Sequence, residues 1–237
     1  MAKEAAIGII GAMDEEIELL LKAAQPIEEI QAAGLKYFQG SLFGKRVVIC
    51  KSGVGKVNAA ITTQVLIDRF QVKTVLFTGV AGAVHPDLNI GDIVISTACM
   101  HHDMDVTALG FAPGVIPFQE TSQFAADPKL IQLAESVCEE YFPGRYRTGL
   151  VLSGDQFIAS RDKVRELHET FDGAVCTEME GAAVAQACFI NQIPFVVIRS
   201  MSDKADGSAQ VNFAEFTVEA SERSYRIVES MVKEIAV

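Results

Sequence analysis

Short apolar runs alternate along the chain with segments whose apolar residues recur at the helical period. The runs, bounded by turn residues, predict buried strands at 6–13, 74–78, 90–96, 149–158, 173–176 and 193–198. Helices are predicted at 14–21, 57–69, 130–141, 161–170 and 213–235. An antiparallel hairpin is predicted from 36–43 and 46–50. We therefore predict an α/β fold: one domain over residues 1–237, three αβα layers, and a central mixed, largely parallel sheet.

The charge of the chain argues against two classes of partner. Its 237 residues include 20 Lys and Arg and 31 Asp and Glu, a formal net charge of −11. Nucleic acids and anionic membrane surfaces are bound through positive surfaces, so neither is expected as a partner. No run of about 18 apolar residues predicts a membrane-spanning helix, and the first residues lack the cleavage region of a secretion signal. We therefore expect a cytoplasmic protein.

An acidic pair, Glu178 and Glu180, lies where the run at 173–176 gives way to an Ala-rich segment of helix-forming composition. Ligands bind at such strand-to-helix junctions in α/β sheets, where the first N–H groups of the helix are free. Glutamates near a helix start also stabilise the helix dipole or cap the helix. From this stretch alone, both interpretations stay open.

Candidate site groups follow four of the predicted strands, at 13–16, 79–82, 178–180 and 199–203, with glycines that let a ligand approach the backbone at 79–82 and charged side chains at the other three. If these strands are parallel, their carboxyl ends form one crevice that brings three carboxylates and one guanidinium together. Two carboxylates on opposite sides of a glycosidic bond can divide the chemistry, one protonating the leaving group and the other activating water. The pattern indicates an enzyme.

Several other motifs are incomplete. Gly8 and Gly11 begin a GxGxxG fingerprint that is not completed, and Gly55-Lys56 lacks the first glycine and the Ser or Thr of a P-loop. Adjacent histidines at 101 and 102 point to opposite faces of an extended segment and do not readily share a metal ion. The five cysteines contain no CxxC pair and predict neither disulfides nor zinc. We expect no metal and no organic cofactor.

A series of short motifs occurs in a fixed order from residue 7 to about residue 216. They are Gly8–Met13 with Glu16, Ser52–Ala60, Thr78–Gly79 with Ala81–Gly82, His102–Asp103 with Asp105–Ala108, Ser153–Asp155 with Phe157–Ile158, Glu178–Glu180, and Arg199 with Ser202–Asp203. The set resembles the 5′-methylthioadenosine/S-adenosylhomocysteine nucleosidase family of the purine nucleoside phosphorylase/uridine phosphorylase superfamily. The resemblance implies a nucleoside phosphorylase-like fold. It also implies hydrolysis of the N9–C1′ bond to adenine and a 5-substituted ribose, with a place in methionine salvage.

The resemblance implies a role for each matching residue. Asp203 would be the general acid that protonates adenine N7, which makes adenine a workable leaving group. Glu16 would be the base that activates water, and Arg199 would help to orient that water. Glu180 would bind the ribose hydroxyls and place negative charge near the developing cation, while Met179 packs against the sugar.

Further contacts to the nucleoside are implied in the same way. Phe157 would stack on adenine, and the Ile158 backbone would bind the edge of the base. Ser202 would position Asp203, and Phe213 would cover the ribose. The remaining residues of the implied binding site are Met13, Ala81, Gly82 and Glu178.

The implied pocket for the 5′-substituent is completed by a second subunit. The matching positions are Val106, Leu109 and Pro117, in or next to the long irregular segment at 111–127. A homodimer is therefore expected, with the partner chain lining the pocket. The family serine of the Thr-Gly-Ser-Ala-Gly motif is Val80 here, and Leu109 takes a place often held by Phe. We expect these departures to change affinity rather than to abolish the reaction.

Three alternatives are weighed against this function. A phosphorylase of the same superfamily needs cationic donors for phosphate, but the run at 76–79 contains no Arg and Glu16 would repel the anion. Aminofutalosine or 5′-deoxyadenosine could serve as a further substrate of the same hydrolysis. A noncatalytic nucleoside sensor is disfavoured because a binding protein needs neither an acid nor a base.

Overall fold

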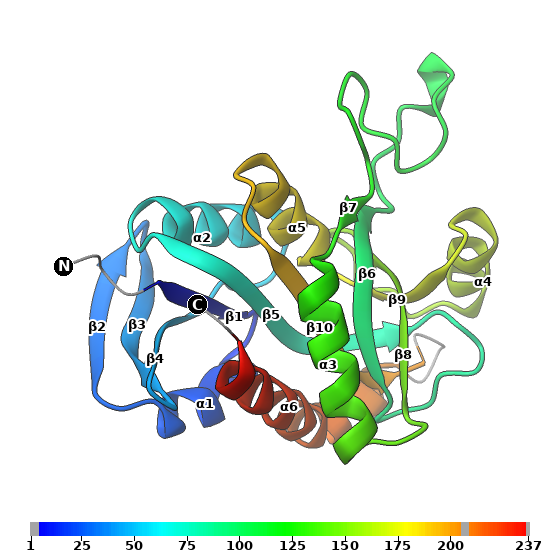
Figure 1. The fold of residues 1–237 in the computed structure, drawn as a ribbon. Helices are drawn as coiled ribbons and strands as arrows, with labels where there is room; N and C mark the ends of the chain where they lie inside the picture. Colours follow the sequence, from blue (N-terminus) through cyan, green and yellow to red (C-terminus); the bar gives the residue numbers. More distant parts are fainter. Residues whose placement is uncertain (1–4, 205–208, 236–237) are drawn as a thin grey trace.

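One central sheet organises the chain, and helices cover both of its faces (Figure 1). The computed structural model describes residues 5–204 and 209–235, and the side chains of 209–215 and 217 lie outside the described part. The strands are β1 (Ala6–Gly11), β2 (Ile27–Ala32), β3 (Leu35–Leu42), β4 (Lys45–Lys51), β5 (Val72–Ala83), β6 (Ile93–His101), β7 (Phe124–Ala125), β8 (Tyr146–Ser153), β9 (Ala174–Glu178) and β10 (Phe195–Asp203). The helices are α1 (Asp14–Ala23), α2 (Lys56–Asp68), the 3₁₀ turn η1 (Thr107–Leu109), α3 (Pro128–Tyr141), α4 (Arg161–Thr170), α5 (Gly181–Ile190) and α6 (Ala209–Glu234).

The sheet consists of two groups of parallel strands that run antiparallel to each other. One group is β4, β1, β5 and β10, and the other is β6, β8 and β9. The groups meet twice, at β10–β6 and at β5–β9, and both pairings are antiparallel. Strands β5, β10, β6, β8 and β9 therefore form a closed ring, and the predicted hairpin β3–β4, with β2 beyond it, extends the sheet on one side.

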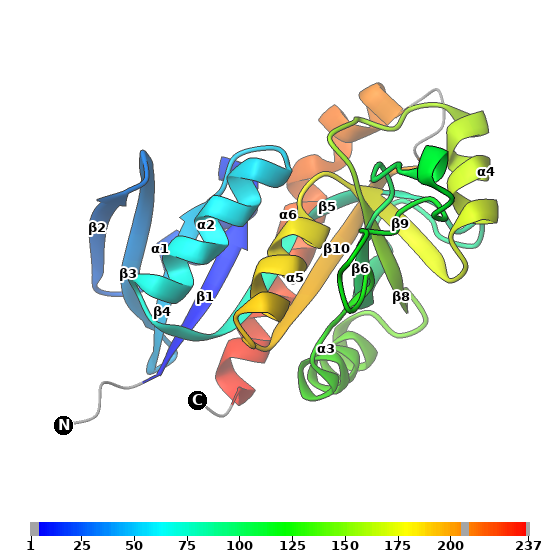
Figure 2. The ribbon, with the colours of Figure 1, turned by 90° about the horizontal axis from the view of Figure 1, so that it is seen from above.

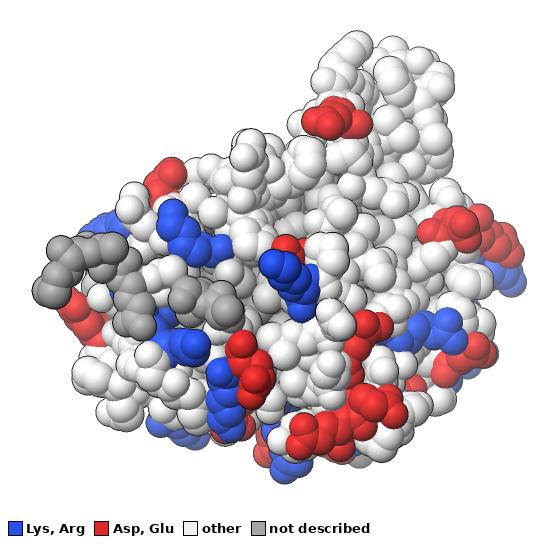
Figure 3. All heavy atoms as spheres, viewed as in Figure 1, with Lys and Arg blue, Asp and Glu red and all other residues white. Residues whose placement is uncertain are grey.

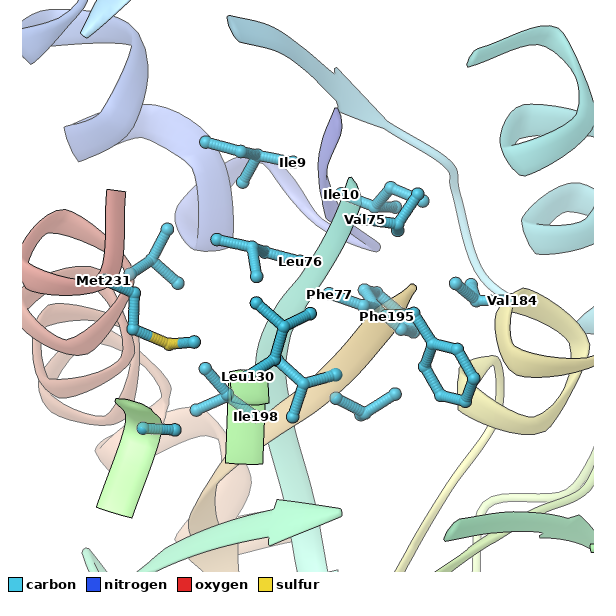
Figure 4. Packing of buried hydrophobic residues seen from close by; sticks show 14 of the residues in the cluster. Ile9, Ile10, Val75, Leu76, Phe77, Leu130, Val184, Phe195, Ile198 and Met231 are labelled. Carbon is cyan, nitrogen blue, oxygen red and sulfur yellow. The ribbon is translucent and has the colours of Figure 1, made fainter. Parts of the chain in front are cut away.

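Helices bury both faces of the sheet. The central strands are accordingly apolar at nearly every position, as expected of parallel strands. Along β5, Leu76 points toward α6 and α3, whereas Val75 and Phe77 point toward α5 (Figure 4). Met231 of α6 and Val184 of α5 close the two sides of this core. Figure 2 shows α2 and α5 side by side on one face, with α6 behind the sheet. The predicted three-layer α/β architecture with a mixed sheet is confirmed.

The structure corrects two details of the sequence interpretation. Strand β5 does not end before the glycines: it continues through Gly79–Ala83, because β10 pairs with it as far as Gly82. Strand β9 is antiparallel to β5, so the four polar strand ends do not all belong to parallel neighbours. Both differences arise from pairing between distant segments, which local patterns do not record. Strand β2 was also not predicted; most of its residues are exposed, and three of the six are polar.

The predicted irregular segment between β6 and β7 projects from the body of the molecule (Figure 1). In the matching surface view, this projection and the area around α5 carry few charged side chains, whereas acidic and basic residues mix over the lower edge (Figure 3). Within residues 5–204 and 209–235, none of the helices combines the length and the apolar composition needed to cross a membrane.

Candidate active site

A cavity of about 310 Å³ opens beside β5, where two neighbouring strands leave a gap. Strand β1 pairs with β5 up to Phe77, and β9 pairs with it from Gly82. Between these points, no strand of the described chain pairs with that edge of β5. The cavity is lined by Ala12, Met13, Glu16, Val54, Val80, Ala81, Gly82, Gln156, Phe157, Ile158, Thr177, Glu178, Met179, Glu180, Ser202 and Asp203. The gap thus exposes backbone groups and collects carboxylates from several elements.

Glu16 fills one side of this gap. Its Oε1 accepts a hydrogen bond from the Val80 N–H at 3.0 Å, and its Oε2 accepts bonds from the N–H groups of Ala12 at 2.5 Å and Met13 at 3.0 Å. The carboxylate is 5% exposed, and it caps α1 while it faces the cavity. Burial raises the pKa of Glu16, although the Arg199 charge and the three N–H groups oppose the shift. The capping role and the cavity position therefore belong to the same side chain.

Gly79 permits the close approach of Glu16 to β5. A Cβ at this position would lie 2.8 Å from the Glu16 carboxyl carbon, closer than real contacts allow, and in a tight contact of 3.1 Å with an Arg199 guanidinium nitrogen. Gly79 is also the direct neighbour of Arg199 in the β5–β10 pairing. The next residue, Val80, contributes its backbone N–H to Glu16. The glycine is therefore required by the space that the two charged groups occupy.

Glu178 ends β9 and holds the start of α5. Its oxygens accept hydrogen bonds from the N–H of Gly181 at 2.8 and 2.9 Å, and also from the Ser153 hydroxyl. Arg199 Nη2 donates to Glu178 Oε2 at 2.6 Å, and both side chains are almost fully buried. The Arg199 guanidinium also lies 3.9 Å from the centroid of the Phe77 ring. Arg199 therefore stands behind the carboxylates and is not among the residues that line the cavity.

Glu180 lies two residues further along and faces the same cavity. Its Oε1 accepts a hydrogen bond from the Gly55 N–H at 2.7 Å, which joins it to the turn before α2. Burial, and then the negative charge of Glu178, raise the pKa of Glu180. The two acidic residues of the sequence motif thus differ: Glu178 is paired with a cation, and Glu180 is held by a backbone N–H.

Asp203 is the last residue of β10, which begins at Phe195. Its side chain is 2% exposed and lines the cavity, and Ser202 Oγ donates to Asp203 Oδ2 at 2.9 Å. Glu16 and Asp203 reach the cavity from different elements, the first turn of α1 and the end of β10. An acid and a base in such an arrangement can act on opposite parts of one ligand.

The apolar residues predicted for the site line the same cavity. Phe157 is half exposed at its mouth, whereas Ile158 is buried. Met13, Met179, Ala81 and Gly82 also contribute to the wall. A cavity with mostly apolar walls and a few carboxylates suits a ligand with a flat apolar part and a polar part.

Four predicted residues lie elsewhere or outside the described part. Val106, Leu109 and Pro117 belong to the projecting segment and do not line this cavity of their own chain, and Leu109 is 72% exposed. Phe213 falls within α6, but its side chain lies outside the described residues.

The sequence interpretation missed groups that act through the backbone or through a second residue. Gly55 and Ser153 hold Glu180 and Glu178, and Val54 lines the cavity. The signal was present in the Ser52–Lys56 and Ser153–Asp155 motifs, but a backbone donor cannot be recognised from residue type. Among the residues that the structure describes, no three His, Cys, Asp or Glu side chains are grouped so as to hold a metal ion.

Comparisons with known proteins agree on one family. The family model described as the phosphorylase superfamily matches residues 6–233. The chain is 43% identical to the 5′-methylthioadenosine/S-adenosylhomocysteine nucleosidase of Staphylococcus carnosus over 229 residues, covering 97% of this chain and 100% of the relative. A solved Neisseria meningitidis nucleosidase of the same name, in complex with methylthio-immucillin-A, is similar with a TM-score of 0.93, 39% identity and coverage of 97% and 99%. A futalosine hydrolase structure from Helicobacter pylori is similar with a TM-score of 0.93, 35% identity and 98% coverage of both chains.

Proposed function

Because the chain belongs to the 5′-methylthioadenosine/S-adenosylhomocysteine nucleosidase family of the phosphorylase superfamily, we propose that it hydrolyses the N-glycosidic bond of both nucleosides with Asp203 as acid and Glu16 as base. The products are adenine and the 5-substituted ribose, and 5′-deoxyadenosine is a further substrate of the same reaction. Methionine salvage is the proposed use of the sulfur-containing product.

In the proposed reaction, the N9–C1′ bond breaks and its electron pair moves to adenine. The Asp203 carboxyl gives its proton to N7, so that adenine leaves as a neutral molecule. C1′ becomes an oxocarbenium-like centre, water adds to it, and Glu16 takes the proton of that water. The raised pKa of Glu16 suits this role, because a base is most effective when its pKa approaches the working pH.

The other carboxylates stabilise the sugar in this proposal. Glu180 binds the ribose hydroxyls next to the carbon that becomes cationic. Met179 packs against the sugar, and Phe213 covers it. Phe157 stacks on the base, and the Ile158 backbone binds the base edge. Arg199 supports the site from behind by holding Glu178 at 2.6 Å and by attracting the Glu16 anion, which keeps the base and the water in place.

One observation favours water over phosphate as the nucleophile. Four carboxylates, from Glu16, Glu178, Glu180 and Asp203, line the cavity, and none of the described lining residues is Lys, Arg or His. The nearby guanidinium of Arg199 is already paired with Glu178. A phosphate dianion would find no cationic donor among the described residues that line the cavity, whereas neutral water needs none.

We also infer a homodimer in which the partner chain lines the pocket for the 5′-substituent. Apolar side chains are exposed on α2, on α5 and on the projecting segment, which lie on one side of the sheet (Figure 1). They are Val57, Ile61, Leu109, Phe118, Phe189 and Ile190. Phe118 is 99% exposed, an unfavourable state for a large apolar side chain that no second chain covers. Val106, Leu109 and Pro117 would then reach the partner's cavity.

The domain and the compartment are inferred from the same chain. The cavity takes residues from position 12 to position 203, so we infer that one domain over the whole chain carries the activity. Cys50, Cys99, Cys138, Cys176 and Cys188 are all free thiols within the core. Unpaired buried cysteines suit a reducing compartment, and we therefore place the protein in the cytoplasm.

Product analysis tests the proposal directly. Purified protein is incubated with methylthioadenosine in phosphate-free buffer and then with added phosphate. Adenine and free methylthioribose are expected in both buffers, at equal rates. A sugar 1-phosphate that forms only with phosphate would identify a phosphorylase, and binding without adenine release would identify a nucleoside sensor.

The similarity to the Helicobacter pylori futalosine hydrolase makes aminofutalosine the second candidate substrate. Its base and ribose would use the same acid and base, so only the 5′-pocket decides between the substrates. Comparing kcat/KM for aminofutalosine, methylthioadenosine and S-adenosylhomocysteine in one preparation separates them. A higher value for aminofutalosine would assign the chain to that substrate.

A further inference from the structure

We propose that Lys56 is a positioning residue that fastens three loops to one another, two that line the cavity and one at the root of the projecting segment, through an ion pair with Asp103 and a backbone bond to Asp155. This inference rests on the proposed function, because two of these loops carry the groups assigned to ribose and base. The lysine belongs to the Gly55-Lys56 pair, which forms no P-loop and which the proposed reaction leaves without a role.

Three contacts, two of them made by Lys56, join the three loops in pairs. Its Nζ donates to Asp103 Oδ1 at 2.6 Å, and its backbone N–H donates to Asp155 Oδ1 at 2.8 Å. The Asp155 N–H in turn donates to Asp103 Oδ2 at 3.0 Å, so Lys56, Asp103 and Asp155 form a closed circuit of contacts. The Lys56 and Asp103 side chains are only 22% and 16% exposed, so the ion pair is partly shielded from water.

Packing keeps these loops at a fixed separation. A Cβ at Gly154 would overlap the His102 ring and lie 3.2 Å from the Asp103 carboxyl carbon. The His102 N–H also donates to the Ser153 carbonyl at 2.9 Å. Burial would raise the pKa of Asp103, but the Lys56 and Asp155 hydrogen bonds more than offset it and the pKa is lowered. Asp103 therefore stays ionised at neutral pH and keeps its attraction for the ammonium group.

Each loop connects this circuit to a different part of the site. Gly55 precedes Lys56 and donates its N–H to Glu180, the proposed ribose ligand. Phe157 and Ile158 follow Asp155 closely and form the proposed base site. Asp103 lies at the root of the projecting segment between β6 and β7. In contrast, Glu16 and Asp203 sit on α1 and β10, outside the circuit. Loss of Lys56 should therefore weaken binding more than it slows proton transfer.

The test compares Lys56→Met with Lys22→Met, whose lysine pairs with Glu18 on the exposed surface of α1. We expect Lys56→Met to raise KM for methylthioadenosine and the dissociation constant of adenine about tenfold, with kcat within about threefold of wild type. Lys22→Met should change neither quantity, and Lys56→Arg should restore part of the affinity. Adding Asp103→Asn to Lys56→Met should weaken binding little further, because Lys56→Met has already removed the Lys56–Asp103 ion pair.

Unchanged KM and adenine affinity in Lys56→Met, or a loss confined to kcat, would overturn the inference. If Lys56→Met does not fold, Asp103→Asn alone is measured in the same way, since it removes the charge and keeps one acceptor oxygen for the Asp155 N–H. An inactive wild-type protein would contradict the proposed function, but adenine affinity would still report on Lys56. The two failures are thus distinguishable.

Discussion

Two cavities of similar volume, about 310 and 340 Å³, lie beside consecutive stretches of residues 80–88. The charged side chains that line them are of opposite kinds, acidic in the first cavity and basic in the second. The first is the candidate active site beside Val80–Gly82, lined by four carboxylates. The second lies beside Ala83–Leu88, and no described residue that lines it is Asp or Glu. Its ionisable residues are His85, Arg161, Arg165, His168 and Lys204.

The difference shows that the placement of charge, and not overall composition, gives each cavity its chemistry. A chain with net charge −11 still gathers cationic side chains a few residues from its acidic cavity. Burial opposes the charged form in both places: it raises the pKa of Glu16 and lowers the pKa of His85. The acidic cavity favours a ligand that becomes positive during reaction, which an oxocarbenium-like sugar does.

Removing the proposed acid, Asp203, from the first cavity should have the largest effect. Asp203→Asn keeps the shape of the side chain but has no proton to give to adenine N7, so kcat should fall about a thousandfold. Binding of a nonhydrolysable nucleoside analogue should stay within a few-fold of wild type. Steady-state kinetics and calorimetry measure the two quantities. A nearly normal kcat would exclude Asp203 as the acid.

Removing the proposed base, Glu16, should have the next-largest effect. Glu16→Gln should lower kcat about a hundredfold, less than the loss of the acid, because water adds to an oxocarbenium ion without a strong base. The amide keeps one acceptor oxygen, for either the Val80 N–H or the Ala12 and Met13 N–H groups, so urea denaturation is measured to check the fold. Full activity in this variant, checked by adenine release, would point to a different base.

Removing the cation behind the carboxylates should have a smaller effect that depends on pH. Arg199 opposes the burial that raises the pKa of Glu16, and activity falls as Glu16 is protonated. In Arg199→Met the acid limb of the kcat/KM profile should therefore move to higher pH. At neutral pH kcat/KM should fall about tenfold, because Glu16 loses the nearby positive charge that holds it in place. Arg147→Met, which removes an exposed pair with Asp87, is the matched control. An unshifted limb in Arg199→Met would contradict the assignment.

A substitution in the second cavity should have the smallest effect. Arg165 is exposed and pairs with Asp162 at 2.7 Å on the surface of α4. Arg165→Gln should leave kcat/KM within about twofold and change the free energy of unfolding by less than about 1 kcal/mol. Kinetics and urea denaturation provide the test. A large loss of activity would mean that the two cavities are coupled.

The sequence predicted those parts of the fold that depend on local pattern. The limits of α4 agree with the predicted 161–170, and β1 and α1 lie close to their predicted positions. The polar strand ends do meet in one cavity. Short-range periodicity and turn residues are sufficient for such predictions, because they report which face of each element is buried.

The remainder depends on pairing between distant segments. The antiparallel direction of β9 could not be predicted from the residues at 173–178, and the continuation of β5 through its glycines depends on β10. Backbone donors such as the N–H groups of Val80 and Gly55 are equally invisible, since every residue except proline carries one. Candidate side chains were therefore easier to predict than the groups that hold them.

The closed ring of β5, β10, β6, β8 and β9 has a consequence for the order in which the molecule opens. Strands β5 and β10 pair with neighbours on both sides, so their central amide protons should exchange with solvent only when the sheet unfolds globally. The turn at Gly55 and the loop at Asp155 are outside the ring and should exchange earlier. Asp203, at the end of β10, pairs with Gly82 of β5 and should therefore stay in place while the loops at the cavity mouth open, so a nucleoside should enter without disturbing the proposed acid.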